Sequence, residues 1–332
     1  MTRKATKLKN KAKLEKPECT PPRLPANSPM DPQLQPFEIK EVEGKGQGVV
    51  ATRDIEAGEL VLKEFPLVVH SNRTSFDGLE DAVSALSDAD KNDYNSLYVN
   101  PSLLSWLPRP LAIFKTNAIQ LVGPQGIKGG LLVQGSRFNH SCLPNCSRFW
   151  DEKQGVEWFI ANRSIEKGEE VCITYGEIRE AKLERRKWLK RSFGFDCGCK
   201  ACSAPEGETS TSDWRRLKIK QIDDLTDKLQ PRPLELIKEV NNALKLLEEE
   251  GLVVGAFDLA NEALMICAWY GDRINASRWI DKALDLLEKE SGIRSTQYKE
   301  VEEWKGDPTR HPAWNDACRQ KRIPSKVLAG PE

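Results

Sequence analysis

The sequence predicts an α+β protein, in which a β-rich half with a helical insert is followed by an all-α half. Three observations lead to this prediction. Short apolar runs between Gly and Pro residues recur through residues 37–69 and 114–173, as is typical of small β-strands. Apolar residues return at helical intervals in residues 78–106 and again beyond residue 213. A chain of 332 residues is long enough for two domains.

The first segment, residues 1–36, predicts a disordered tail. Residues 1–16 carry seven Lys or Arg against one Glu, and seven Pro lie from Pro17 to Pro36. Such a stretch buries too little apolar surface to offset the entropy lost on ordering. Its basic part is a solubilising tail, a nuclear import signal or a tail that binds nucleic acid weakly. The formal net charge of zero gives no global field toward nucleic acid, and no apolar run approaches the ~18 residues of a membrane span.

The predicted strands begin at residue 37. Residues 37–42 lead into a glycine-rich turn at residues 44–48 (GKGQG). Residues 55–59 (IEAGE) and 165–169 (IEKGE) have the same chemistry and predict two turns of one type between strands. The apolar runs that predict the other strands are residues 49–51, 60–62, 67–69, 114–122, 129–133, 158–160 and 171–173.

The predicted helices fall in two places. Leu79, Val83, Leu86, Tyr94 and Leu97 recur at helical spacing, so an insert of about residues 78–106 interrupts the strands. After a tether at residues 203–212, the apolar pattern predicts four helices around residues 222–229, 237–247, 256–270 and 279–287, the last three followed by Gly251, Gly271 and Gly292. Short linkers imply antiparallel helical hairpins, which could present a surface to a protein partner.

Three motifs follow one another between residues 137 and 202. They are an Asn-His pair in residues 137–146 (RFNHSCLPNC), a Tyr at the end of a strand in residues 171–176 (VCITYG), and a cysteine cluster in residues 197–202 (CGCKAC). Three His in the chain and no Gly-x-Ser-x-Gly argue against a hydrolase triad. The cluster instead predicts a metal site.

Nine Cys in a chain without a secretory signal argue against a disulfide framework. Structural Zn²⁺ takes four ligands in a tetrahedron, and thiolates are among its preferred ligands. Cys197, Cys199 and Cys202 can supply three of them from one tight loop. Spacing alone leaves the fourth ligand open among Cys142, Cys146 and Cys172.

Together with the turn at Gly46–Gly48, these motifs resemble those of the SET-domain protein lysine methyltransferases. The resemblance runs from about residue 38 to residue 203, and the helical additions are similar to those of the SMYD-like branch. It implies a β-clip fold with knot-like threading and a structural Zn²⁺. It also implies methylation of Lys side chains on a histone or another protein, in the nucleus or the cytoplasm, with S-adenosylmethionine as cofactor. No Cys lies between Cys19 and Cys142, so the MYND zinc module of that branch is absent.

The resemblance also implies domains and roles. The SET domain would span residues 37–190, the post-SET zinc segment residues 191–205, and the C-terminal helical domain residues 213–332. Tyr175 would be the catalytic residue and a cofactor contact, and Cys142 the fourth zinc ligand beside Cys197, Cys199 and Cys202. The other cofactor-binding residues would be Lys45, Gly46, Gln47, Gly48, Asn117, Asn139, His140 and, stacked on adenine, Phe195.

One residue departs from the family pattern. The family often has a second channel Tyr four residues before the first Cys of the zinc cluster, and Phe193 stands at that position. The missing hydroxyl would change how many methyl groups are added or leave the chain with little activity. The alternative hypothesis is therefore a weakly active or inactive protein on the same fold that acts as a protein-interaction scaffold.

Overall fold

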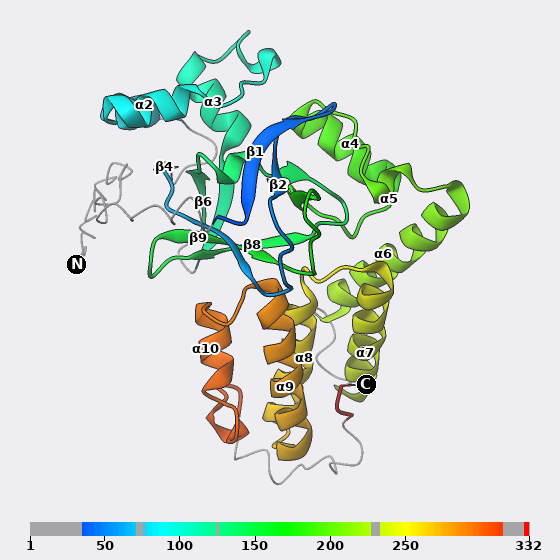
Figure 1. Ribbon diagram of the computed structural model, residues 1–332. Coiled ribbons are helices and arrows are strands. Elements are labelled where there is room, and N and C mark those ends of the chain that lie inside the picture. Colours follow the sequence, from blue (N-terminus) through cyan, green and yellow to red (C-terminus); the bar gives the residue numbers. More distant parts are fainter. Residues whose placement is uncertain are drawn as a thin grey trace, which may run out of the picture.

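The computed structural model describes residues 35–70, 76, 78–123, 126–226, 233–314 and 329–331. The fold is α+β, as predicted. Small β-sheets form one body, and long helices lie side by side beneath it (Figure 1). Residues 1–34 of the expected tail lie outside the described residues. Within the described ranges, no helix combines the length and apolar character that crossing a bilayer requires.

The strands in chain order are β1 (Phe37–Val42), β2 (Gly46–Ala51), β3 (Leu60–Glu64), β4 (Val68–His70), β5 (Ile119–Gly123), β6 (Gly126–Leu131), β7 (Asn139–His140), β8 (Cys146–Asp151), β9 (Val156–Ala161) and β10 (Glu170–Ile173). They form three sheets with the orders β1-β2-β10-β7, β3-β9-β8 and β4-β6-β5. β7 and β10 run parallel, which places Asn139 opposite Cys172 and His140 opposite Ile173. The knot-like threading stays a prediction.

The helical insert is longer than expected. It contains α1 (Leu79–Ser84), α2 (Asp88–Asn95), a 3₁₀ turn (Pro101–Leu103) and α3 (Arg109–Asn117). The strand predicted to start at residue 114 was therefore wrong over residues 114–117. Pro110 stands in the first turn of α3, where its missing N–H costs nothing. Leu111 to Phe114 are buried there, so this apolar run belongs to a helix.

The remaining helices are α4 (Lys182–Phe193), α5 (Lys200–Ser203), α6 (Glu206–Thr226), α7 (Pro233–Glu250), α8 (Ala256–Trp269), α9 (Arg273–Glu290) and α10 (Thr296–Glu302), with a last 3₁₀ turn at Pro308–Arg310. The sequence did not indicate α4, because its buried positions include a charged residue, Arg185, beside Leu189. α6 begins inside the expected tether.

The predicted helical module is otherwise confirmed in α6–α9. Ile222 is buried in α6, while Leu229 lies outside the described residues. The glycines that follow α7, α8 and α9 have φ of 68°, 66° and 75°, as expected of helix C-terminal signals. α7, α8 and α9 stand side by side below the sheets (Figure 1), and their core includes the fully buried Trp279 and Cys267.

The two turns of like sequence pair with each other. Ile55 and Ile165 form an antiparallel bridge and exchange two backbone hydrogen bonds of 2.9 Å. Gly58 and Gly168 occupy equivalent positions in the two turns, with φ of 82° and 87°. The prediction of one turn type is confirmed, and the pair ties β3 and β10 into the same core.

The buried apolar residues form separate clusters in the described chain. One fills the β-rich body, one fills the insert and one fills the C-terminal helices. A smaller cluster contains Leu189 and four cysteines, with aromatic residues packed against it. Tyr175 packs against both this cluster and the β-rich core. The predicted site therefore lies where the two clusters meet.

Candidate active site and metal centre

The parallel pair of β7 and β10 brings the Asn-His motif to Tyr175. The Tyr175 backbone N–H donates to His140 Nδ1 at 3.1 Å, and the Tyr175 hydroxyl donates to the Phe138 carbonyl at 2.8 Å. Both ends of the tyrosine are therefore held by residues 138–140. Burial raises the pKa of Tyr175, so the hydroxyl keeps its proton at physiological pH.

Aromatic rings surround Tyr175. Its ring centroid lies 4.9 Å from Phe193, 5.3 Å from His140 and 6.4 Å from Phe195. Trp188 on α4 packs against Phe193, and a side chain on Gly176 would put its Cβ 2.4 Å from that indole. The chain after Tyr175 must therefore pass close to α4, which makes one wall of the site apolar.

The glycine-rich turn meets Asn139 through Glu170, a residue that the sequence motifs did not single out. The Asn139 amide donates to Glu170 Oε1 at 2.9 Å and to the Gln47 carbonyl at 3.3 Å. Lys45 Nζ lies 2.5 Å from Glu170 Oε2. Burial has the largest single effect and lowers the pKa of Lys45, but the hydrogen bond and the charges of Glu170 and the nearby cysteines together raise that pKa above its ordinary value. A Cβ on Gly48 would lie 2.8 Å from Asn139 Nδ2, so the close approach requires glycine.

Asn117 lies at the end of the insert helix α3. Its side-chain amide donates to the carbonyls of Ile113 and Tyr98, both at 2.7 Å. Its own carbonyl accepts from Ser136 Oγ at 3.3 Å. The backbone of Asn117 thus approaches the loop before Asn139, while the bonds of its amide remain within the insert. Its role as a cofactor ligand stays a prediction.

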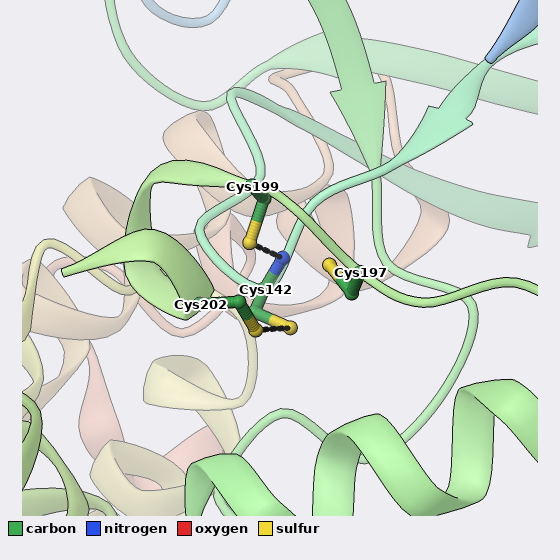
Figure 2. A group of neighbouring side chains, drawn as sticks. All are labelled: Cys142, Cys197, Cys199 and Cys202. Carbon is green, nitrogen blue, oxygen red and sulfur yellow. Dashed lines mark hydrogen bonds between the residues drawn. The ribbon is translucent and has the colours of Figure 1, made fainter. Parts of the chain in front are cut away.

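The four predicted metal ligands lie together (Figure 2). Cys197, Cys199 and Cys202 come from the segment around α5, and Cys142 comes from the loop after β7. All four are buried, and their sulfurs lie within 4.8 Å of one another. The Cys142 and Cys202 sulfurs are 3.6 Å apart, too far for a disulfide bond. The other two candidates for the fourth ligand, Cys146 and Cys172, are not members of the group.

This geometry fits Zn²⁺. Four sulfurs about 2.3 Å from one ion lie about 3.8 Å apart in a tetrahedron. The Cys142–Cys202 sulfur distance of 3.6 Å is close to this value, and no two of the four sulfurs are more than 4.8 Å apart. The thiolate is the metal-binding form of cysteine. Hydrogen bonds from the Cys142, Cys197 and Cys202 thiols lower the pKa of Cys199, which favours its thiolate. The Cys142 backbone N–H also donates to Cys199 Sγ at 3.4 Å (Figure 2). Zinc binding stays a prediction, now with four converging ligands.

Two arginines that the sequence did not indicate flank the cluster. Arg185 is 3% exposed and lines the same small internal void as Cys142 and His140. Arg216, from α6, is fully buried and donates to the Cys142 carbonyl at 3.1 Å. A charged residue in a helix is ordinarily expected to face solvent. The local sequence therefore did not predict that either arginine would be buried.

Comparison with known proteins agrees with this geometry. The model of the SET domain family matches residues 46–176, which hold the glycine-rich turn, Asn139, His140 and Tyr175. The chain carries a SET domain. The zinc segment lies beyond the match, and the expected domain limits of residues 37–190 and 191–205 stay predictions.

Several proteins that are similar to this chain are named for a methyltransferase activity. The chain is 28% identical over 282 residues to histone-lysine N-methyltransferase set5 of Schizosaccharomyces pombe, which covers 83% of this chain and 85% of the relative. It is 34% identical over 126 residues to mouse histone-lysine N-methyltransferase SMYD3, covering 38% of this chain and 24% of SMYD3. Mouse protein-lysine N-trimethyltransferase SMYD5 is 36% identical over 78 residues, which are 23% of this chain and 19% of SMYD5.

Proposed function

We propose that the chain is a protein-lysine N-methyltransferase that uses S-adenosylmethionine and acts on a histone or another protein. One observation carries the proposal: the β7–β10 pair holds Asn139 and His140 beside the strand that leads to Tyr175. The names of the relatives from S. pombe and mouse, which describe lysine methylation, support it. A substrate of this kind would place the activity in the nucleus or the cytoplasm.

The reaction needs a neutral, positioned lysine. Bound S-adenosylmethionine would supply an electrophilic methyl group. A free lysine has a pKa of about 10.4, so its neutral form at pH 7 costs about 4–5 kcal/mol. The rings of Phe193 and Phe195 contact Tyr175, and beside these apolar rings a lysine amine would be poorly hydrated, which disfavours the ammonium form. Positioning of the two reactants can contribute up to about 7–11 kcal/mol.

Tyr175 is suited to orient the amine and not to act as a base. Its hydroxyl proton is committed to the Phe138 carbonyl, so its oxygen remains an acceptor for an amine N–H. For the cofactor, we propose residues 45–48, the Asn139 amide, the His140 backbone and the ring of Phe195. Asn117 would contact the cofactor only if its side-chain amide gave up one of its two hydrogen bonds to carbonyls of the insert.

The test is transfer of labelled methyl groups from S-adenosylmethionine to proteins of a cell extract. We expect transfer by the full-length chain and a roughly tenfold or larger fall in rate for Tyr175→Phe, because the amine loses its orienting oxygen. Tyr98→Phe is the matched control, since Tyr98 is 63% exposed on the insert. A chain that binds the cofactor but transfers no label would exclude the proposal.

That outcome would favour the scaffold alternative. Two observations give it some support. Phe193 packs on Tyr175 without offering a hydroxyl. A groove of about 630 Å³ also lies between the zinc segment and helices α6 and α7, lined by Lys200, Arg215 and Glu250 among others. Binding of a protein partner that Tyr175→Phe leaves unchanged would then be expected.

Glu170 is expected to position two of the proposed cofactor contacts. Its carboxylate holds Asn139 and Lys45 together from opposite oxygens. We expect Glu170→Ala to weaken S-adenosylmethionine binding about tenfold in isothermal titration calorimetry, because two side chains lose their common acceptor. Glu170→Gln keeps an acceptor for Asn139 and should lose less.

The control for this experiment is Glu41→Ala. Glu41, an exposed residue of β1, accepts from the Gln47 side chain at 2.9 Å, and so it contacts the same turn without touching Asn139 or Lys45. We expect this variant to bind the cofactor as the wild type does. Equal losses in Glu41→Ala and Glu170→Ala would mean that the turn as a whole, and not the carboxylate of Glu170, decides affinity.

A further inference from the structure

The His140 side chain connects the cysteine cluster to Tyr175. The imidazole is 6% exposed, and both of its ring nitrogens have partners inside the protein. Nδ1 accepts from the Tyr175 backbone N–H at 3.1 Å, and Nε2 lies 3.2 Å from Cys142 Sγ. Because Nδ1 accepts a hydrogen bond, the neutral ring carries its proton on Nε2. The Nε2–H therefore donates to the sulfur of Cys142.

The strength of this bond depends on the charge of the sulfur. A thiol is a weak acceptor, whereas a thiolate accepts a charge-assisted hydrogen bond. Zn²⁺ binds cysteine as thiolate, so an ion in the cluster would strengthen the bond to His140. Donors to metal-bound ligands are known to fix the orientation of those ligands. Here the donor is itself fixed at its other nitrogen to Tyr175.

Arg185 gives independent support for a negatively charged cluster. Its guanidinium faces Cys142 and Cys202, and its Nε has no hydrogen-bond partner among the described residues. An unpaired buried donor on a charged group is costly. Its Nη1 donates to the Glu180 carbonyl and lies 3.6 Å from Asp213 Oδ1, so only the side of the guanidinium that carries Nε is left to the cluster. Four thiolates and one Zn²⁺ carry a net charge of two minus, and they would give that side an anionic neighbour. Arg185 therefore matches a metal-bound cluster better than four neutral thiols.

We propose that metal in the cysteine cluster positions Tyr175 through the imidazole of His140. The metal site then does more than hold the segment around Phe195. It sets the backbone position of the residue proposed to orient the substrate amine, so loss of the ion would release Tyr175 as well as the zinc segment. The coupling between the metal site and Tyr175 does not depend on the proposed function. Its importance for catalysis rests on that function.

A second route could also carry an effect of the ion. Phe193 and Phe195 precede the cysteine cluster in the chain, and both rings contact Tyr175. Release of the zinc segment could disturb Tyr175 through these contacts alone. The experiment must therefore separate the route through His140 from the route through the aromatic rings.

Two substitutions of His140 separate its bond to Tyr175 from its bond to Cys142. The amide of Asn reaches the position of the imidazole Nδ1, and the amide of Gln reaches that of Nε2. His140→Asn can keep the bond to Tyr175 and loses the bond to Cys142. His140→Gln can keep a donor to Cys142 and loses the bond to Tyr175. We expect His140→Asn to weaken Zn²⁺ binding about tenfold in competition with a chelator, and His140→Gln to change it little.

The position of Tyr175 is read from its backbone amide. The chain has five Tyr, so ¹⁵N-tyrosine labelling gives five amide signals, and the one missing in Tyr175→Phe is that of Tyr175. In the full-length wild type, we expect zinc removal to move this signal more than the other four, and zinc addition to restore it. Neither His140 variant should show this zinc-dependent movement. If a His140 variant fails to fold, the wild-type measurement still tests whether the metal changes the position of Tyr175.

Two results would overturn the proposal. One is a Tyr175 signal that does not respond to zinc in the wild type. The other is a response of equal size in both His140 variants, which would assign the coupling to Phe193 and Phe195. These measurements involve no methyl transfer. A protein in which zinc moves the Tyr175 signal but which transfers no methyl groups would count against the proposed function and not against this coupling.

Discussion

Replacing Arg216 by Met is expected to lower the free energy of unfolding by about 3–5 kcal/mol, the usual cost of removing one partner of a buried ion pair. The Arg216 side chain is fully buried, and its Nε lies 2.8 Å from Glu250 Oε1. Its Nη1 donates to the carbonyls of Cys142 and Ile178. The substitution would remove the nearest cation from the carboxylate of Glu250, which is only 7% exposed. It would also leave the two carbonyls without this donor. Urea denaturation followed by circular dichroism measures the change.

The neighbouring residue offers a matched control. Arg215 pairs with Glu249 at 3.1 Å, where the two side chains are 28% and 40% exposed, and its Nη1 lies 3.8 Å from Glu250 Oε2. When Arg215 is replaced, Arg216 still holds Glu250 at 2.8 Å. We expect Arg215→Met to cost about 0–1 kcal/mol, as for other exposed pairs. The double variant Arg216→Met with Glu250→Met removes both buried charges and should recover much of the loss. Equal costs for Arg215→Met and Arg216→Met would show that burial of the pair does not matter.

Replacing Cys142 by Ser is expected to weaken Zn²⁺ binding more than about 100-fold, beyond the effect of losing a residue that only supports a ligand. A hydroxyl is a poor substitute for the thiolate, and the remaining cysteines leave the tetrahedron open. Metal content after dialysis against a chelator should fall from one Zn²⁺ per chain to near none. Hydrogen exchange should accelerate across residues 195–203, since metal binding and folding of this segment are coupled.

Cys146→Ser is the control for this substitution. Cys146 is also buried and lies four residues away in the same motif, but its thiol faces the Ser147 carbonyl at 3.5 Å and not the cluster. It should therefore retain one Zn²⁺ per chain. Loss of metal in both variants would mean that folding of the motif, and not ligation by Cys142, holds the ion.

The elements that the sequence predicted well are those with strong local signals. The alternation of short apolar runs with glycine located most strands, and the helices α7–α9 followed from their apolar periodicity and terminal glycines. The errors have a local cause as well. The apolar run Leu111–Phe114 fits a buried helix as well as a strand, so periodicity could not decide whether residues 114–117 belong to a helix or begin a strand. α4 was missed because Arg185 is buried where a local pattern requires an apolar residue.

By itself, the sequence determined which residue types are available to the site: the glycine-rich turn, the Asn-His pair, the tyrosine and the cysteines. Spacing predicted three metal ligands and left the fourth open among Cys142, Cys146 and Cys172. The family resemblance added Cys142 as the fourth. Only the tertiary structure showed that the four sulfurs lie within 4.8 Å of one another, and that Glu170, Arg185 and Arg216 lie beside the predicted site residues. Their contacts join residues 57 to 125 positions apart in the chain. Such contacts depend on how sheets and helices pack, which no local pattern of residues records.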